Sequence, residues 1–156
     1  MITCILFDFS RVLLFPKDES YTGGLNKLNR ILADQPGYSI LDHFRLNEEL
    51  LAYLRILGKS RDIYIFTSET IQDAPEFAPH LASAFKGVYS ATKLSTSKKL
   101  PEAYEIVLKD LNKKPEEVLF VDDNKGNIEA ASLAGLHTIL YTSNAQLFSE
   151  LEKKLQ

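Results

Sequence analysis

The chain has 156 residues, of which 45% are apolar and 25% are charged, and its net charge is -3. This length suits one domain with a real hydrophobic core, and the composition is that of an ordinary globular protein. The slight acidity excludes a general nucleic-acid-binding surface, so an anionic ligand would need local positive charge or a metal ion.

The chain contains one cysteine, Cys4, which excludes an internal disulfide framework and favours a reducing compartment. The apolar residues 1–7 are too few for a signal peptide and have no basic residues before them. No apolar run approaches the ~20 residues that a membrane-spanning helix needs. We therefore expect a cytoplasmic protein that does not associate with membranes.

The first predicted element is a strand over residues 3–9, because this short run is apolar and rich in β-forming residues. Residues 16–42 are irregular and hold only one short amphipathic stretch, so we expect a small helical insertion or lid there. A helix is predicted over 46–57, where leucines recur at a helical period: Leu46, Leu50, Leu54 and Leu57.

The second half alternates strands and helices. Strands are expected at 62–67, more weakly at 87–90, then at 118–122 and 137–141. Helices are expected at 101–111, where Pro101 suits the first turn, and at 124–134, which Gly135 would close. Asn144 is predicted to cap a last helix with an apolar stripe of Leu147, Phe148, Leu151 and Leu155.

Strands that alternate with helices indicate an α/β fold, an open and mostly parallel sheet with helices on both faces. We expect one domain over residues 1–156, with 16–42 as a short cap. There is no internal repeat and no low-complexity segment that would suggest another architecture.

Polar residues fall at the ends of three predicted strands, at Asp8, at Thr67 and at the acidic pair 122–123. In open α/β sheets, ligands bind at the carboxyl ends of the strands, so these side chains should meet there. Mg²⁺ takes one or two carboxylates from a protein, which Asp8 and Asp123 would supply. The expected phosphoryl-contacting groups are the hydroxyl of Thr67 and the ammonium group of Lys98 or Lys99.

Four segments resemble, in the same order, the motifs of the haloacid dehalogenase (HAD) superfamily, whose members are mostly phosphatases and phosphotransferases. Residues 5–14 (ILFDFSRVLL) are similar to the nucleophile motif, and residues 63–68 (IYIFTS) to the second motif. Residues 98–104 (KKLPEAY) resemble the family's Lys-Pro-x-Pro-x-x-Tyr, with Lys99 in place of the usual proline. Residues 118–127 (VLFVDDNKGN) are the most specific signal. The resemblance covers nearly the whole chain and implies a Rossmann-like HAD fold.

The resemblance implies a role for each matching position. Asp8 would be the nucleophile, forming an aspartyl-phosphate, and also a ligand of Mg²⁺. The backbone carbonyl of Ser10 would be a second ligand, and Asp123 a third, with Asp122 beside it in the metal shell. The remaining implied contacts are those of Thr67, Ser68 and Lys98 with the phosphoryl group, and that of Asn127 with the loop after Asp123. Lys98 matches the family spacing to Tyr104, which favours it over Lys99.

The nucleophile motif departs from the family at two positions. Ser10 replaces a second aspartate that in the family protonates the leaving oxygen and later activates water, and Arg11 replaces the usual glycine. General acid–base help is worth roughly 10²–10⁴ in rate, so turnover should be slow or restricted to good leaving groups, or the aspartyl-phosphate should be long-lived. Glu19 and Glu69 are weak candidates for a replacement acid.

Three other functions compete with a phosphatase. A receiver domain is rejected because its acidic pair follows the first strand and its lysine comes late, the reverse of the order here. A metal-free dehalogenase is disfavoured because the pair 122–123 indicates a cation. A degenerate HAD-fold protein that binds a phosphorylated ligand without turnover stays open because of Ser10. The expected partner is a small phosphorylated substrate or a phosphorylated macromolecule.

Overall fold

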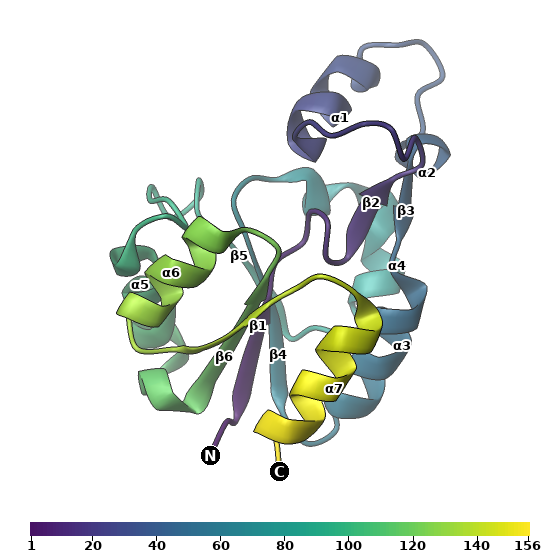
Figure 1. The fold of residues 1–156 in the computed structure, drawn as a ribbon. Coiled ribbons are helices and arrows are strands. Elements are labelled where there is room, and N and C mark those ends of the chain that lie inside the picture. Colours follow the sequence, from purple (N-terminus) through teal and green to yellow (C-terminus); the bar gives the residue numbers. More distant parts are fainter.

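The computed structural model describes residues 1–156 and contains a five-stranded sheet that carries helices on both faces (Figure 1). The strand order is β5-β4-β1-β6-β7, and every neighbouring pair is parallel. The strands are β1 (Cys4–Phe7), β4 (Asp62–Thr67), β5 (Gly87–Ser90), β6 (Val118–Asp122) and β7 (His137–Leu140). This arrangement confirms the predicted α/β class.

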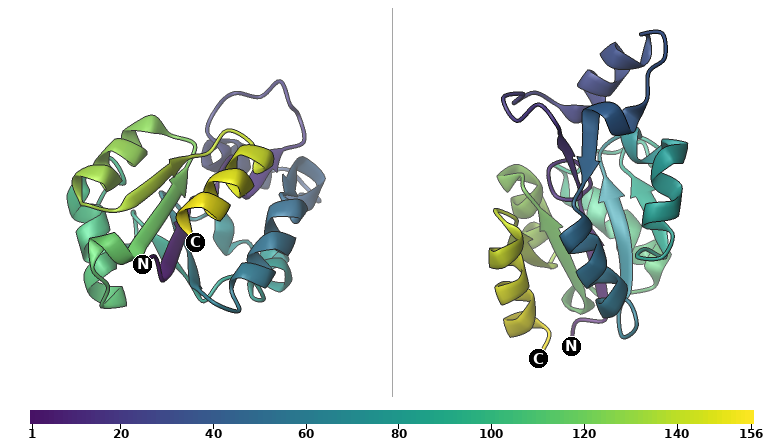
Figure 2. Two further views of the ribbon diagram at one scale, coloured as in Figure 1. Left: turned by 60° about the horizontal axis from the view of Figure 1, so that its bottom comes forward. Right: turned by 90° about the vertical axis from the view of Figure 1, so that its right-hand side faces the viewer.

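The two faces of the sheet are covered by different helices (Figure 2). Ile5 and Phe7 of β1 pack in one apolar cluster with α3 (Glu48–Leu57) and α7 (Asn144–Lys154). Cys4 and Leu6 pack in a second cluster with α5 (Pro101–Leu111) and α6 (Lys125–Leu133). Because successive side chains of a strand point to opposite faces, the continuously apolar β1 can only be a strand buried on both sides.

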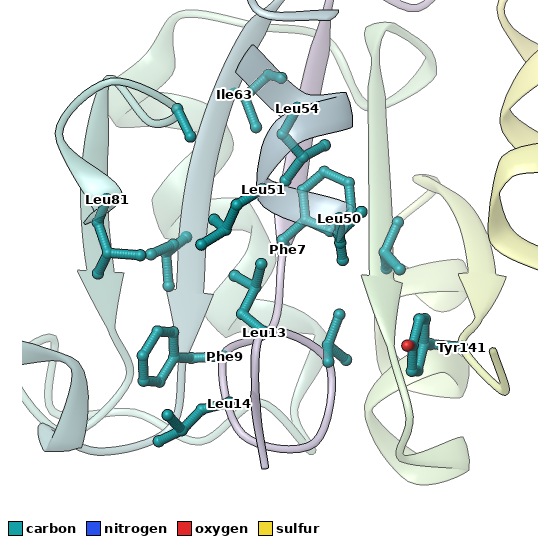
Figure 3. Close-up of a cluster of buried hydrophobic side chains, with 14 of the residues drawn as sticks. Phe7, Phe9, Leu13, Leu14, Leu50, Leu51, Leu54, Ile63, Leu81 and Tyr141 are labelled. Carbon is teal, nitrogen blue, oxygen red and sulfur yellow. The ribbon is translucent and has the colours of Figure 1, made fainter. Parts of the chain in front are cut away.

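The cluster on the α3 face continues into the loop that follows β1 (Figure 3). Phe9 and Leu13 of this loop and Leu14 at its end are fully buried, and they belong to the same apolar cluster as Leu50 and Leu51 of α3. The loop also turns tightly, since the backbone N–H groups of Leu13 and Leu14 both donate to the carbonyl of Phe9. Apolar burial and this turn therefore hold Asp8 and Ser10 in place at the end of the central strand.

Several element boundaries match the expectations to the residue, namely those of β4, β6 and α5. Strand β1 is shorter than the predicted 3–9, and β7 stops at Leu140. Helix α3 does not begin at Leu46: Asn47 caps it by accepting the N–H of Leu50, and Leu46 lies in a strand. Helix α7 is capped by Ser143 and not by Asn144, whose side chain instead exchanges hydrogen bonds with Asn47.

The segment between residues 17 and 43 lies over the carboxyl ends of the strands (Figure 1). It is carried by a small antiparallel ribbon of β2 (Leu14–Pro16) and β3 (Phe44–Leu46) and contains α1 (Leu25–Ala33) and α2 (Ile40–His43). The ribbon was not predicted because three-residue strands are too short to show a periodic pattern.

The remaining elements are short and join the larger ones. They are η1 (Ile71–Asp73), η2 (Pro75–Phe77), α4 (Ala78–Leu81) and η3 (Pro115–Glu117). None of the helices has both the length and the apolar character that crossing a membrane requires.

Candidate functional site

A polar pocket of about 460 Å³ lies at the carboxyl ends of the strands, below the segment that leads into α1. Its walls come from the loop after β1, the end of β4, the loop after β6 and residues 22–26. Only one of its lining residues is hydrophobic. The fourteen lining residues are Asp8, Ser10, Arg11, Thr22, Gly23, Gly24, Leu25, Asn26, Thr67, Ser68, Glu69, Asp123, Asn124 and Asn127.

Asp8 is held at the floor of this pocket by a buried lysine. The Nζ atom of Lys98 lies 2.6 Å from Oδ1 of Asp8 and 2.6 Å from Oδ2 of Asp122. Its side chain is 1% exposed and its ammonium group faces the rings of Phe66 and Phe120. Lys99 is exposed, so Lys98 is the lysine that the fold brings to Asp8. Lys98 lies behind Asp8 and does not itself line the pocket.

Asp122 is fully buried, and protein donors surround its carboxylate. Oδ1 accepts the backbone N–H of Asn124 at 2.8 Å, and Oδ2 accepts the side-chain amide of Asn127 at 3.0 Å in addition to Lys98. The hydroxyl of Tyr104 lies within hydrogen-bond distance of the carbonyls of Lys98 and Asn127. These contacts join the third and fourth sequence motifs, and they leave Asp123 as the acidic residue of the pair that faces the pocket.

The site carries more negative than positive charge. Asp8, Asp122 and Asp123 each offer an oxygen, and these oxygens lie within 4.8 Å of one another around one lysine. Burial raises the pKa of Asp8 to about 7, although the charge of Lys98 opposes the shift. Burial and the charge of Asp122 also raise the pKa of Asp123, while Lys98 and Arg11 act against it.

Lys98 itself stays protonated in these surroundings. Burial favours its neutral form, but the charges and hydrogen bonds of Asp8 and Asp122 outweigh burial and raise the pKa of the ammonium group. Lys98 is the one cation within ion-pair distance of these three carboxyl groups, and Arg11 acts on Asp123 from farther away. A divalent cation bound among these oxygens would balance the charge, and an all-oxygen donor set fits a hard ion such as Mg²⁺. Asp8, Asp123 and the backbone carbonyl of Ser10 are the groups that would hold it.

The predicted hydroxyl residues also reach the pocket. Thr67 is buried at the end of β4, and the exposed Ser68 follows it. Ser10 lies beside Asp8, and its Oγ atom is buried without a hydrogen-bond partner. Glu69 lines the pocket but pairs with Arg30 at 2.8 Å, and Glu19 does not line it.

Sequence reasoning did not assign a role to several pocket residues. Arg11 spans the wall, where its Nη2 atom donates to the carbonyls of Tyr21 at 3.0 Å and Gly23 at 2.7 Å. Asn26 accepts the backbone N–H groups of residues 70 and 71, which fastens α1 to the loop after β4. These contacts join segments 10 to 45 residues apart. A single sequence carries no signal for such contacts, apart from an arginine where the family has glycine.

Comparison with known proteins identifies a family that matches most of the chain. A family model described as a haloacid dehalogenase-like hydrolase matches residues 28–135, which include Thr67, Lys98 and the pair 122–123 and begin after Asp8. Enolase-phosphatase E1 of Komagataella phaffii is 30% identical over 103 residues, which are 60% of this chain and 43% of that protein. Bifunctional epoxide hydrolase 2 of Rattus norvegicus is 36% identical over 73 residues, which are 47% of this chain and 13% of that protein. The chain thus spans less than half the length of these curated relatives.

Solved structures share the fold at low sequence identity. A HAD-family enzyme of Bacteroides thetaiotaomicron, crystallised with magnesium and inorganic phosphate, has a TM-score of 0.70 and 15% identity over 95% of this chain and 100% of that chain. A HAD-like family hydrolase of Porphyromonas gingivalis has a TM-score of 0.72 and 19% identity over 100% of this chain and 98% of that chain. With the family match over residues 28–135, the chain belongs to the haloacid dehalogenase-like hydrolases.

Proposed function

We propose that this protein is a Mg²⁺-dependent phosphoryl-transfer hydrolase that forms an aspartyl-phosphate at Asp8. The observation that carries the proposal is the position of Asp8, which lies at the floor of a polar pocket with Lys98 behind it and Asp123 beside it. A carboxylate so placed serves both as nucleophile and as metal ligand. The magnesium and phosphate bound by the related Bacteroides enzyme support the same assignment.

We propose that four residues act directly in phosphoryl transfer. Asp8 attacks phosphorus, and Lys98 holds the attacking carboxylate in orientation and adds positive charge below the phosphoryl group. The hydroxyls of Thr67 and Ser68 donate to phosphoryl oxygens. When bound, Mg²⁺ supplies further charge neutralisation of the phosphoryl group.

Asp122 and Asn127 act through other residues. The buried carboxylate of Asp122 fixes the position of Lys98 and, through Asn124 and Asn127, the loop that presents Asp123. We therefore propose that Asp122 positions the site and is not a direct metal ligand, in contrast to the role expected from the family resemblance. Asn127 supports this loop, as that resemblance implies.

The nature of the pocket limits the substrate. It is lined almost wholly by polar groups, and residues 22–26 cover it from above, which we propose acts as a short cap over the site. Such a pocket favours a small, hydrophilic phosphate ester or acyl phosphate over a bulky apolar one. The phosphatase relative supports a phosphate ester as the substrate class.

The test is turnover of p-nitrophenyl phosphate and acetyl phosphate by the purified protein, with Mg²⁺ and with EDTA. We expect turnover that requires Mg²⁺ and that falls to background in Asp8→Asn, which keeps the shape of the side chain but removes the nucleophile. Lys99→Gln, a change of an exposed neighbour, is the matched control and should keep full activity. Failure of the wild type to turn over any phosphate of such a panel would contradict the proposal.

A second candidate function rests on Ser10. Ser10 stands at the position where the family has its general acid, and its hydroxyl is buried without a hydrogen-bond partner. The alternative is therefore a protein that binds a phosphorylated ligand and does not turn it over. Ser10→Asp separates the two: a rise in phosphatase activity, with fold and metal binding intact, means that the machinery is complete except for the acid. An unchanged rate means that the missing acid is not the limit, and the absence of turnover in both proteins favours the binding function.

A further inference from the structure

Arg11 is the one cation in the wall of the pocket. One nitrogen of its guanidinium, Nη2, is fastened to the carbonyls of Tyr21 and Gly23. A guanidinium has five N–H groups, and these two bonds use the two of Nη2. The N–H groups of Nε and Nη1 have no hydrogen-bond partner in the protein, and no carboxylate forms an ion pair with Arg11. The side chain is thus held in place while three donors stay available to a ligand.

The backbone conformation of Arg11 also indicates a functional role for its side chain. Its φ is +62°, in the left-handed region that glycine adopts freely and that carries a steric cost for arginine. The turn after Phe9 needs this conformation, because the N–H of Arg11 donates to the carbonyl of Leu14. A strained residue at a pocket wall points to a role for its side chain.

Arg11 lies on the side of the pocket where the leaving oxygen is expected. In an in-line displacement at phosphorus, the nucleophile and the leaving oxygen lie on opposite sides. Asp8 attacks from the floor, so the leaving oxygen faces the cap side of the pocket. Arg11 is fastened to this side, at Tyr21 and Gly23, and follows Ser10, the position from which the family's acid serves the leaving oxygen.

We infer that Arg11 is a catalytic residue that stabilises the negative charge on the leaving oxygen. It would do by charge what the absent carboxylic acid would do by proton transfer. This inference rests on the proposed function and deepens it, because it names the group that lets a site with Ser10 release a product.

The step balances without a general acid. An oxygen of Asp8 forms a bond to phosphorus as the bond from phosphorus to the leaving oxygen breaks, and the electron pair of that bond stays on the leaving oxygen. Arg11 donates hydrogen bonds to this oxyanion and keeps its protons, because a guanidinium does not deprotonate in proteins. The leaving group departs as an anion or takes a proton from water. Water then attacks the aspartyl-phosphate, which releases inorganic phosphate and restores Asp8.

The test is the dependence of kcat/KM on the leaving group, measured with Mg²⁺ on aryl phosphates that range from dinitrophenyl to phenyl phosphate. Arg11→Gln should lose roughly 10²-fold on phenyl phosphate, the usual effect of one oxyanion donor, and much less on dinitrophenyl phosphate. Its plot against leaving-group pKa is therefore steeper than that of the wild type. Arg11→Lys, which keeps the charge, should lie between the two.

Two further variants keep the test decisive. Arg11→Gly removes the same side chain but suits the left-handed backbone, so it replaces Arg11→Gln if that variant folds poorly. Arg30→Gln breaks the pair between Arg30 and Glu69 and loosens α1 without touching Arg11. It should leave the slope of the plot unchanged.

The outcomes separate this inference from the proposed function. If Arg11→Gln and Arg11→Gly change kcat/KM by the same factor for all substrates, or not at all, the only role of Arg11 is to anchor residues 21–23 through its hydrogen bonds. The inference then fails while the proposed function stands. If the wild type turns over neither the aryl phosphates nor acetyl phosphate, the proposed function fails and the inference falls with it.

Discussion

At the scale of single residues, the site depends on a lysine that is buried between two aspartates. Removing an ammonium group from water costs several kcal/mol, and the protein offsets this cost with short contacts to Asp8 and Asp122. The Lys98 side chain is 1% exposed and its ammonium group lies over two aromatic rings, so water does not replace these partners. The cluster is therefore sensitive to the loss of any one member.

Lys98→Met should lower the free energy of unfolding by about 3–5 kcal/mol at neutral pH, because it leaves two buried carboxylates without a counter-charge. The loss should shrink as the pH falls. The pKa of Asp8 is already raised by burial and would rise further without Lys98, so protonation relieves the repulsion. Urea unfolding in metal-free buffer measures the effect. Lys99→Met, at an exposed position, should change stability little; equal stability of the two variants would contradict the cluster's importance.

Cys4 offers a second test at this scale. It is fully buried in β1, and burial raises the pKa of its thiol to about 12. Because the thiolate is the reactive form, the native protein should resist a thiol reagent such as DTNB at pH 8 for as long as it stays folded. The urea-unfolded chain should react within the mixing time. Rapid labelling of one thiol in native buffer would mean that β1 opens to solvent more easily than its burial indicates.

At the scale of elements, Asn47 links three parts of the fold. Its side-chain oxygen caps α3, and its amide donates to the carbonyl of Val12 in the loop after β1 and to Asn144 at the start of α7. The same residue thus sets the entry of α3, the start of α7 and the path of the loop that carries Ser10 and Arg11. Asn47 therefore both caps α3 and positions the loop of the candidate site.

Asn47→Ala should cost about 2–3 kcal/mol of stability, more than an ordinary cap, because it removes the cap and also leaves buried groups unpaired. Ser143→Ala, which removes the exposed cap of α7, should cost only about 1 kcal/mol. Thermal and urea unfolding of both variants measure the difference. A smaller loss in Asn47→Ala than in Ser143→Ala would show that the link across the three elements contributes nothing.

At the scale of the whole molecule, stability is unevenly distributed. The sheet is buried between two layers of helices, and β1 is hydrogen-bonded to a strand on each side. Helix α1, by contrast, buries only Leu25 and is fastened by Asn26 and by the exposed pair of Arg30 and Glu69. An exposed pair contributes roughly 0.2–1 kcal/mol, so α1 can open without disturbing the sheet.

Hydrogen exchange should therefore separate these regions. Amides of α1 should exchange orders of magnitude faster than those of β1, β4 and β6, since local opening of α1 exposes less apolar surface than opening of the sheet. Arg30→Gln should speed exchange in α1 further and leave the strands unchanged. Protection of α1 equal to that of β1 would show that the segment and the sheet open as one unit.

Much of this protein follows from its sequence alone. Strands such as β4 and β6 are apolar runs closed by polar residues, and α5 begins at Pro101, so local composition is sufficient to place their ends. The alternation of strands and helices predicts the parallel sheet. Because the strands of such a sheet point the same way, Asp8, Thr67 and Asp123 had to come together at one edge.

Other features were decided by tertiary structure. Asn144 lost its cap role because Asn47, nearly a hundred residues earlier, pairs with it. The spacing to Tyr104 already favoured Lys98 over Lys99, but only the fold shows Lys98 turned inward, between Asp8 and Asp122. The reach of Arg11 to Tyr21 and Gly23 is likewise set by packing. Local pattern determines which residues form an element, but contacts between distant segments depend on how the elements pack, and only the folded chain brings those groups within bonding distance.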